Sequence, residues 1–336
     1  MRNRLDHFQS HRNLLAFCLL FISPYLIGQQ SSSNTAVSTA TGTGSPASNP
    51  NQVAILRWYS ANQTATFSVG RGPGKVVFDG NHIWVSSSGA NTVTKLEASD
   101  GKLLGTFPAG SSPQGMAFDG ANIWTANQGS SSVTKLRASD GVLLGTFPVG
   151  FSPFDVAFDG ADIWVVNLGS SNVTKLRAND GRVLGTFNVG PSPQGIAFDG
   201  TAIWVANTAD STLTKLRASN GALLGTFVAG TGPVGLAFDG ANIWVANQGS
   251  NNVTKLRAND GSVLGTFPVG SLPQTVVFDG VNIWVTNFSS NTVTKLRAAD
   301  GALIGTFPVG DFPEGAAFDG ANVWVANAGS GTLSKR

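Results

Sequence analysis

The side chains that carry most enzymatic catalysis are scarce in this 336-residue sequence. The complete set of histidines, cysteines and glutamates is His7, His11, His82, Cys18, Glu97 and Glu314. His7, His11 and Cys18 lie in an N-terminal segment that we expect to be removed from the mature protein. Histidine-based metal clusters and nucleophile–base pairs are then unavailable to the rest of the chain. We therefore expect no metal site and no cofactor.

One acid–base pair remains as a catalytic candidate. Lys75, Asp155 and Thr275 occupy one position of a repeated segment that is glycine in the other four copies. The repeat predicts that this position rings the mouth of a central channel. A lysine and an aspartate brought together there could exchange a proton with a substrate. Lys75 and Asp155 are the only catalytic residues that the sequence suggests, and it leaves open whether the protein is an enzyme.

These residues belong to a 40-residue repeat that begins at Gly70. Phe-Asp-Gly recurs at 78–80, 118–120, 158–160, 198–200, 238–240, 278–280 and 318–320. A tryptophan follows each time, at 84, 124, 164, 204, 244, 284 and 324. In the copy from Gly230 to Val269, VGLAF, NIWVAN, VTKLRA and SVLGTFPV are typical of four short strands joined by Asp-Gly turns and one polar loop. The period predicts an all-β, seven-bladed β-propeller of four-stranded blades.

The two ends of the repeat array predict a closed ring. The last copy stops at Arg336 after its third strand, and Thr64 to Phe67 aligns with the missing fourth strand. Residues 53–58, VAILRW, align with VTKLRA, and Trp58 replaces an alanine there. An N-terminal strand can therefore complete the last blade and remove open sheet edges. We expect Trp58 to plug this seam, with a binding role as the alternative.

Residues before the propeller predict export. Residues 1–28 combine basic residues with a short apolar run, LLAFCLLFI, which is typical of a signal peptide, with an uncleaved N-terminal anchor as the alternative. Residues 29–52 are rich in serine, threonine and glycine and predict a flexible linker, which leaves 53–336 for the propeller. We expect a secreted, periplasmic or cell-envelope protein whose only membrane contact would be that anchor.

Charge argues against nucleic-acid binding. Removing residues 1–28 takes away three of the 21 basic and one of the 19 acidic residues, so the mature chain is neutral. Phosphate binding depends on an excess of lysine and arginine.

The repeat resembles two known families. Copies of the form xPxGxAFDGxNIWVANxGSNxVTKL are similar to the YVTN-type β-propeller repeat and to the repeats of the streptogramin (virginiamycin B) lyase group, over about residues 53–336. The resemblance implies a propeller fold. It also implies, for the lyases, a site that uses histidine, glutamate and a divalent metal. This chain departs from that pattern because its variable loops contain no histidine.

Most repeated residues are interpreted as frame. The seven tryptophans are expected to be core, and turn chemistry accounts for the Phe-Asp-Gly segments. The TKLRA strands with their following acidic turns are expected to be solvated outer strands with weak ion pairs. His82 replaces a usual asparagine in a Phe-Asp-Gly turn and is interpreted as surface drift.

Binding residues are expected where the copies differ. Two loops vary, the one before the first strand and the one between strands two and three, and both should emerge on one face of the ring, here called the variable face. The predicted binding residues are Arg71, Lys75, Gln114, Phe151, Phe154, Asp155, Gln194, Asp210, Gln274, Phe288, Asp311, Phe312 and Glu314. Arg71 and Lys75 are expected to form an ion-pair cluster with Asp311 and Glu314 across the seam.

These features favour one function and leave two others open. The favoured one is an exported, non-catalytic and monomeric propeller that binds a protein, glycan or cell-envelope component. The alternatives are a lyase-like or hydrolytic propeller enzyme that acts at the channel mouth, and a purely structural module.

Overall fold

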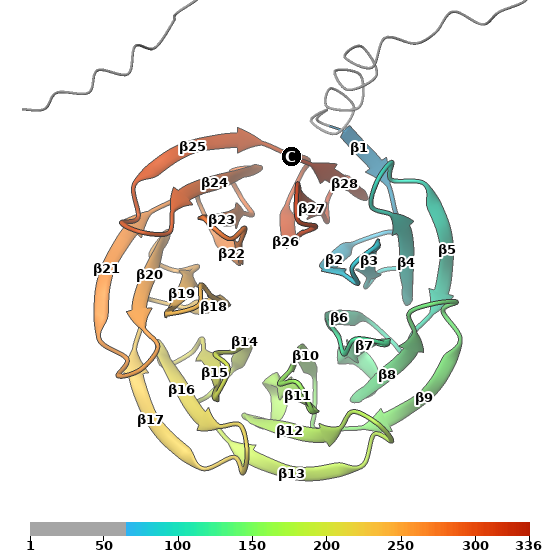
Figure 1. Ribbon diagram of the computed structural model, residues 1–336, viewed down its shortest axis with the longest axis horizontal. Coiled ribbons are helices and arrows are strands. Elements are labelled where there is room, and N and C mark those ends of the chain that lie inside the picture. The colour runs from blue at the N-terminus through green and yellow to red at the C-terminus, as the bar shows by residue number, and fades with distance from the viewer. Residues whose placement is uncertain (1–64) are drawn as a thin grey trace, which may run out of the picture. The chain divides into compact units, whose positions relative to one another are not determined.

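The computed structural model describes residues 65–336, and the predicted signal peptide, the linker, Trp58 and the segment 53–58 lie outside this range. Twenty-eight strands form seven four-stranded antiparallel sheets around a central axis (Figure 1). No helix in residues 65–336 is long and apolar enough to cross a membrane.

Six blades follow the chain from the centre outwards. Blade 1 contains β2 (Pro73–Phe78), β3 (His82–Ser87), β4 (Thr92–Glu97) and β5 (Leu103–Pro108). Blade 2 contains β6 (Pro113–Phe118), β7 (Asn122–Asn127), the 3-10 turn η1 (Gln128–Ser130), β8 (Ser132–Arg137) and β9 (Leu143–Pro148). Blade 3 contains β10 (Pro153–Phe158), β11 (Asp162–Asn167), η2 (Leu168–Ser170), β12 (Asn172–Arg177) and β13 (Val183–Asn188).

The second half of the ring repeats this plan. Blade 4 contains β14 (Pro193–Phe198), β15 (Ala202–Asn207), β16 (Thr212–Arg217) and β17 (Leu223–Val228). Blade 5 contains β18 (Pro233–Phe238), β19 (Asn242–Asn247), β20 (Asn252–Arg257) and β21 (Val263–Pro268). Blade 6 contains β22 (Pro273–Phe278), β23 (Asn282–Asn287), β24 (Thr292–Arg297) and β25 (Leu303–Pro308).

Blade 7 closes the ring as predicted. Its inner strands are β26 (Pro313–Phe318), β27 (Val323–Asn327) and β28 (Thr332–Lys335), and its outer strand is β1 (Ala65–Ser68). Ala65 pairs with Lys335 and Ser68 with Thr332 in antiparallel register. The prediction of a seven-bladed all-β propeller closed by an N-terminal strand is therefore confirmed.

The core consists of apolar layers between neighbouring blades. In one layer, Trp124 of blade 2 packs with Val156 and Ile163 of blade 3. Six of the seven repeated tryptophans are fully buried and Trp284 is 8% exposed, which confirms that they are frame. Since both faces of a blade are covered by its neighbours, burial of these rings holds the blades together.

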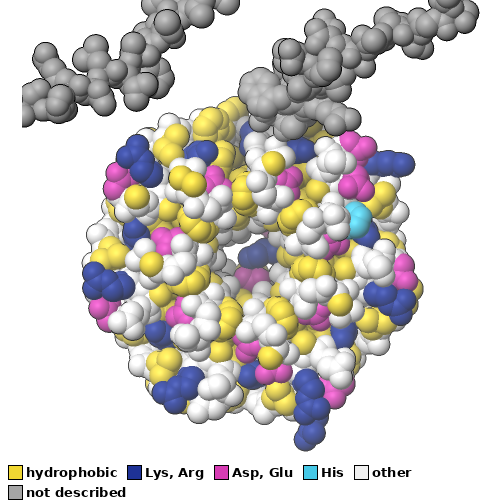
Figure 2. Space-filling view, viewed as in Figure 1, with side chains coloured by type: hydrophobic (Ala, Val, Ile, Leu, Met, Phe, Trp, Pro, Cys, Tyr) yellow, Lys and Arg dark blue, Asp and Glu magenta, His cyan; other side chains and the backbone are white. Residues whose placement is uncertain are grey.

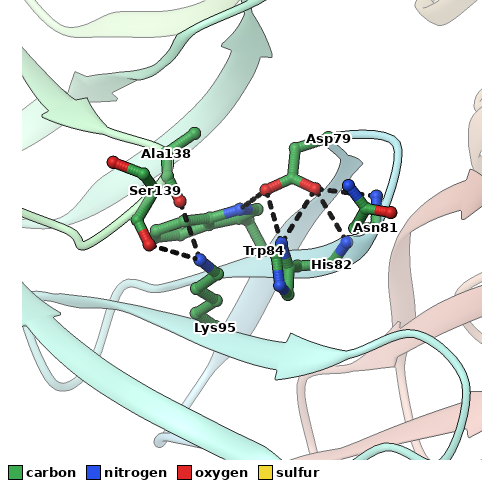
Figure 3. A network of polar contacts seen from close by, with 7 residues as sticks. All are labelled: Asp79, Asn81, His82, Trp84, Lys95, Ala138 and Ser139. Carbon is green, nitrogen blue, oxygen red and sulfur yellow. Dashed lines mark hydrogen bonds and ion pairs between the residues drawn. The ribbon is translucent and has the colours of Figure 1, made fainter.

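Each Phe-Asp-Gly turn does more than reverse the chain. In Figure 3 the Asp79 carboxylate accepts hydrogen bonds from the backbone N–H groups of Asn81 and His82 and from Trp84 Nε1, the last at 2.8 Å. In each of the six remaining blades, the tryptophan Nε1 donates to the aspartate of its own turn at 2.7–2.8 Å. His82 Nδ1 lies 3.1 Å from Asp79, where Asn122 Nδ2 contacts Asp119 in blade 2. His82 therefore replaces the asparagine contact with the turn aspartate. The interpretation of His82 as surface drift did not include this contact.

Six of the seven lysines of the TKLRA strands are buried and Lys295 is partly buried, so the prediction of solvated strands is wrong for them. Lys95 is 4% exposed, its Nζ lies 5.1 Å from the centre of the Trp84 ring, and it donates to Ala138 O of blade 2 at 2.7 Å (Figure 3). Lys335 makes the same contact across the seam, donating to Ala98 O at 3.1 Å. We call this recurring arrangement of aspartate, tryptophan and lysine the Asp–Trp–Lys stack. The arginines two residues later, such as Arg137 beside Asp140, are exposed as predicted.

Candidate functional site

Each innermost strand carries a β-bulge at the channel mouth. In β2, Pro73 pairs with Ser87 and Val76 with Val85, so Gly74 and Lys75 together oppose a single residue. The same irregularity occurs in all seven blades. Because a bulge re-aims side chains, two consecutive positions of each blade can line the channel.

These positions enclose a cavity of about 470 Å³. The first bulge position contributes Gly74, Gln114, Phe154, Gln194, Val234, Gln274 and Glu314. The second contributes Lys75, Gly115, Asp155, Gly195, Gly235, Thr275 and Gly315, and the loops add Gln248, Leu272 and Phe288. Figure 2 shows the ring hollowed at its centre, with basic and acidic side chains inside the hollow. The size falls in the range of small-molecule sites.

The predicted binding residues divide between this cavity and its rim. Eight line the cavity, namely Lys75, Gln114, Phe154, Asp155, Gln194, Gln274, Phe288 and Glu314. The other five, Arg71, Phe151, Asp210, Asp311 and Phe312, do not line it and are exposed. The two variable loops lie on the same face, as predicted, and they contact each other, since Gly89 N donates to Arg71 O in blade 1.

Besides glycines, four lining residues were absent from the predicted binding set, namely Val234, Gln248, Leu272 and Thr275. Val234 and Gln248 stand at positions that vary between the copies and could have been included on that ground. Leu272 stands where five other copies have glycine or serine and one has Phe312, and its φ of 52° is left-handed. A bulky residue where the backbone favours glycine is the signal that could have identified it.

Lys75 and Asp155 lie together, as the candidate pair requires. Lys75 Nζ is 2.9 Å from Asp155 Oδ2, and the Asp155 side chain is 7% exposed. The contact reaches past blade 2 at Gly115, where an added Cβ would lie 2.4 Å from Asp155 Cα. Asp155 Oδ1 accepts the backbone N–H of Val156 at 3.0 Å. Both carboxylate oxygens are thus engaged within the protein.

The predicted ion-pair cluster across the seam does not form, so that expectation is wrong. Lys75 is turned toward Asp155 because the glycine of blade 2 leaves the path between them open. Asp311 instead accepts a hydrogen bond from Asn291 Nδ2 at 3.0 Å. Within residues 65–336, no salt bridge links Arg71 or Lys75 to Asp311 or Glu314.

Glu314 is the one acidic side chain in the cavity that has no partner in the described chain. Its backbone oxygen accepts a hydrogen bond from Thr286 Oγ1 at 2.8 Å, but its carboxylate receives none from residues 65–336. Loss of solvent around the half-buried carboxyl raises its pKa to about 7. The group is therefore poised to change charge near neutral pH.

An aromatic pair lies on the blade 6–blade 7 side of the channel mouth. The rings of Phe288, in blade 6, and Phe312, in blade 7, are stacked with centroids 5.0 Å apart. Phe312 N donates to Asn291 Oδ1 at 2.9 Å, which fixes the loop that carries it. Because Phe288 lines the cavity and Phe312 supports it, an aromatic ring and an unpaired carboxyl belong to the same lining.

Among the described residues, no group of three or more histidine, cysteine, aspartate or glutamate side chains could hold a metal ion. The only described histidine, His82, belongs to a Phe-Asp-Gly turn and does not line the cavity.

Solved structures with the same fold include several lyases. A streptogramin B lyase is 19% identical with a TM-score of 0.71, and the match covers 81% of this chain and 96% of that one. Virginiamycin B lyase from Staphylococcus aureus is 17% identical with a TM-score of 0.70, over 81% and 98% of the two chains. It is also known as a catalytically inactive histidine variant with quinupristin.

A different enzyme shares the fold as well. Hydrazine synthase from Kuenenia stuttgartiensis is 18% identical with a TM-score of 0.69, over 79% of this chain and 95% of that one. No protein-family model and no curated protein sequence matches the chain. At these identities the likeness is one of fold, and the chain has the lyase-like seven-bladed propeller that its repeats resemble.

Proposed function

We propose that this protein is an exported, non-catalytic propeller that binds a protein, glycan or cell-envelope component through its variable face. The observation that supports this most is the contrast between frame and mouth. Seven blades repeat the Asp–Trp–Lys stack, whereas the first bulge position alone carries glycine, glutamine, phenylalanine, valine and glutamate. Rigid scaffolds that vary at one face are typical of binding proteins.

The cavity chemistry also favours binding. Four glutamines line it, Gln114, Gln194, Gln248 and Gln274, and their amides can both donate to and accept from a polar, uncharged ligand. Phe154 adds an apolar surface among them. The Lys75–Asp155 ion pair favours a structural role for both residues, because a base whose two oxygens are already engaged is a poor proton acceptor.

The test is a direct binding measurement with defined ligands. The full chain would be applied to arrays of cell-envelope glycans and of peptides, beside a Phe154→Ala/Gln194→Ala variant and a Val281→Ala control. Val281 is exposed in a turn of the opposite face, so Val281→Ala should not change ligand binding. We expect the mouth variant to lose the ligands that the native protein and the control retain, with unchanged circular dichroism. Equal binding by all three proteins would overturn the assignment of the mouth as the site.

The alternative is a propeller enzyme at the same mouth. Two observations favour it, the lyase-like fold and the Glu314 carboxyl whose raised pKa suits proton transfer near neutral pH. Incubation with quinupristin, followed by chromatography and tandem mass spectrometry, tests the streptogramin lyase form of it. A new product formed by the native protein and lost in Glu314→Gln would favour the enzyme. An unchanged substrate would leave this form without support.

Export is proposed on the N-terminal residues alone. Mass spectrometry of the protein recovered from its producer would show the mature N-terminus. We expect it near Gln29, and an intact Met1 terminus in the membrane fraction would favour the anchor instead.

A further inference from the structure

The variable face carries few charges, and most of them are negative. Its charged residues among those described are Arg71, Lys75, Asp155, Asp210, Asp311 and Glu314. Lys75 and Asp155 neutralise each other at 2.9 Å. The remaining face has one arginine against three carboxyl groups, so its electrostatics favour a cationic ligand over an anionic one.

Within this face, Glu314 is where a cation would gain most. The carboxyl lines the cavity, is half-buried, and has no donor or cation beside it in the described chain. A buried charge without a counter-ion is unfavourable, which is why burial raises its pKa. A ligand ammonium group in hydrogen-bond contact would supply the missing partner.

The wall next to Glu314 is apolar and held in a strained backbone. Leu272 and Phe312 have φ of 52° and 54°, at the position that is Gly72 or Gly232 in two other blades and serine in the remaining three. Hydrogen bonds from their N–H groups to Asn251 Oδ1 and Asn291 Oδ1 hold these loops in place. Left-handed backbone at a bulky residue costs energy, and such strain gathers at ligand-binding sites.

Two contacts bring the wall and the carboxyl to one place. Thr286 Oγ1 of blade 6 donates to Glu314 O of blade 7, and Phe288, two residues further along, stacks on Phe312. Phe288 and Leu272 line the same cavity as Glu314. A ligand that reaches the carboxyl therefore also meets aromatic and aliphatic surface, and its ammonium can be stabilised by the ring faces.

We propose that the blade 6–blade 7 side of the channel mouth binds ligands in which a primary ammonium group is joined to an apolar group, with Glu314 as the counter-ion, Leu272 and Phe288 as the apolar wall, and Phe312 supporting Phe288 from the rim. This inference rests on the proposed binding function and narrows its ligand class. The same chemistry occurs in small arylalkyl amines and at the N-terminus of a peptide that begins with an apolar residue.

The test compares pairs of probes that differ only in charge. Isothermal titration calorimetry of the full chain would use 2-phenylethylamine against 2-phenylethanol, and the peptide Phe-Gly-Gly against its N-acetylated form. We expect each amine to bind roughly tenfold or more tightly than its neutral partner. Binding of both amines supports the ammonium–apolar class, and preference for one of them identifies the small-molecule or the peptide source.

Variants locate the site. Glu314→Gln should weaken amine binding roughly tenfold and Phe288→Ala several-fold. Glu97 is the only other glutamate and lies outside the cavity, so Glu97→Gln should leave amine binding unchanged. Binding of 2-phenylethylamine, whose ammonium group stays protonated in this range, should tighten as the pH rises through about 7, where Glu314 ionises, while the nearby Lys75 is paired with Asp155. The Glu314→Gln variant should show a flat profile, which a merely structural role would not produce.

The outcomes separate this inference from the broader function. Equal binding of amine and alcohol, no amine binding, or full binding by Glu314→Gln would overturn it. If a neutral glycan or peptide then bound and was lost in Phe154→Ala/Gln194→Ala, the binding function would stand and only its ligand class would be wrong. If the native protein bound none of the amines, glycans or peptides, the result would count against both the ammonium-binding inference and the broader binding function.

Discussion

At the scale of single residues, each blade depends on one carboxylate. Asp239 accepts hydrogen bonds from Trp244 Nε1 at 2.8 Å and from the backbone N–H groups of Ala241 and Asn242 at 2.9 and 2.7 Å. Asp239→Ala would leave these donors unpaired and should lower the free energy of unfolding by about 2–4 kcal/mol. Asp239→Asn keeps one acceptor and should cost about half as much. Urea unfolding measures both, and a negligible loss for Asp239→Ala would contradict the role.

The same carboxylates predict acid sensitivity. Burial opposes ionisation of Asp239, but the hydrogen bonds from Trp244, Asn242 and the turn backbone outweigh it and lower the pKa of this carboxyl below 3.8. A lowered folded-state pKa gives stability above the unfolded value that is lost as pH falls through the folded one. Thermal unfolding should therefore show a steep loss of Tm below about pH 4. Asp239→Asn should show a smaller loss, and an identical pH dependence would contradict this cause.

The contribution of Glu314 to stability changes with pH in the opposite direction. Its pKa is raised from 4.5 to about 7, so the folded protein binds a proton that the unfolded chain releases earlier. Its contribution to stability is full below about pH 4.5 and is lost as the pH rises through 7. Glu314→Gln should match the native protein at pH 4 and exceed it at pH 8 by on the order of 2 kcal/mol or less, because solvent still reaches the carboxyl. A variant that is less stable at pH 8 would show that Glu314 has a partner.

At the scale of one strand, neighbouring basic residues have different roles. Lys255 of β20 is 7% exposed, lies 5.1 Å from the centre of the Trp244 ring and donates to Ala298 O at 2.7 Å. Lys255→Met would remove the cation and leave a carbonyl of the next blade unpaired, which should cost about 2–3 kcal/mol. Arg257→Met, two residues away and 52% exposed, should cost little. Similar losses for the two variants in denaturant titrations would contradict the stack.

The contrast between Lys255 and Arg257 shows which features of a strand can be predicted from its sequence. The period of 40, the Asp-Gly turns and the strand lengths predict the blades, since these depend on local geometry. Alternation in VTKLRA separates two faces of a strand but does not reveal that a neighbouring blade covers the face of Lys255. The burial of these lysines follows from blade packing, which a single repeat does not encode.

The residues of the channel mouth were also predicted only in part. Comparing copies identified eight of the cavity-lining residues, because loops at the same register of each blade must lie at the same end of the ring. The bulge that exposes two consecutive residues, and the ion pair that passes Gly115 from Lys75 to Asp155, were not predicted as structural contacts. Both depend on distances between blades, and the expected cluster with Glu314 was wrong for that reason.

At the scale of the whole molecule, stability depends on the seam between the first and last strands of the ring. Phe67 of β1 lies 5.3 Å from Trp324 of blade 7, and its ring occupies the space beside Gly101 of blade 1. Phe227 makes the same contacts inside the ring, 5.1 Å from Trp204 and beside Gly261. The two residues therefore share surroundings and differ in whether their strand is joined to its own blade by a turn.

This contrast yields a prediction about how the ring opens. Phe67→Ala and Phe227→Ala should each cost about 2–4 kcal/mol of global stability. Only Phe67→Ala should release a local opening, since β1 has four residues, pairs with β28 alone and has no hairpin turn to hold it there. Hydrogen exchange should then accelerate at Leu333 and Lys335, whose backbone N–H groups face β1, well before the rest of the ring. The freed edge of β28 should also promote association at high concentration. Uniform protection in Phe67→Ala, equal to that in Phe227→Ala, would mean that the propeller opens only as one cooperative unit.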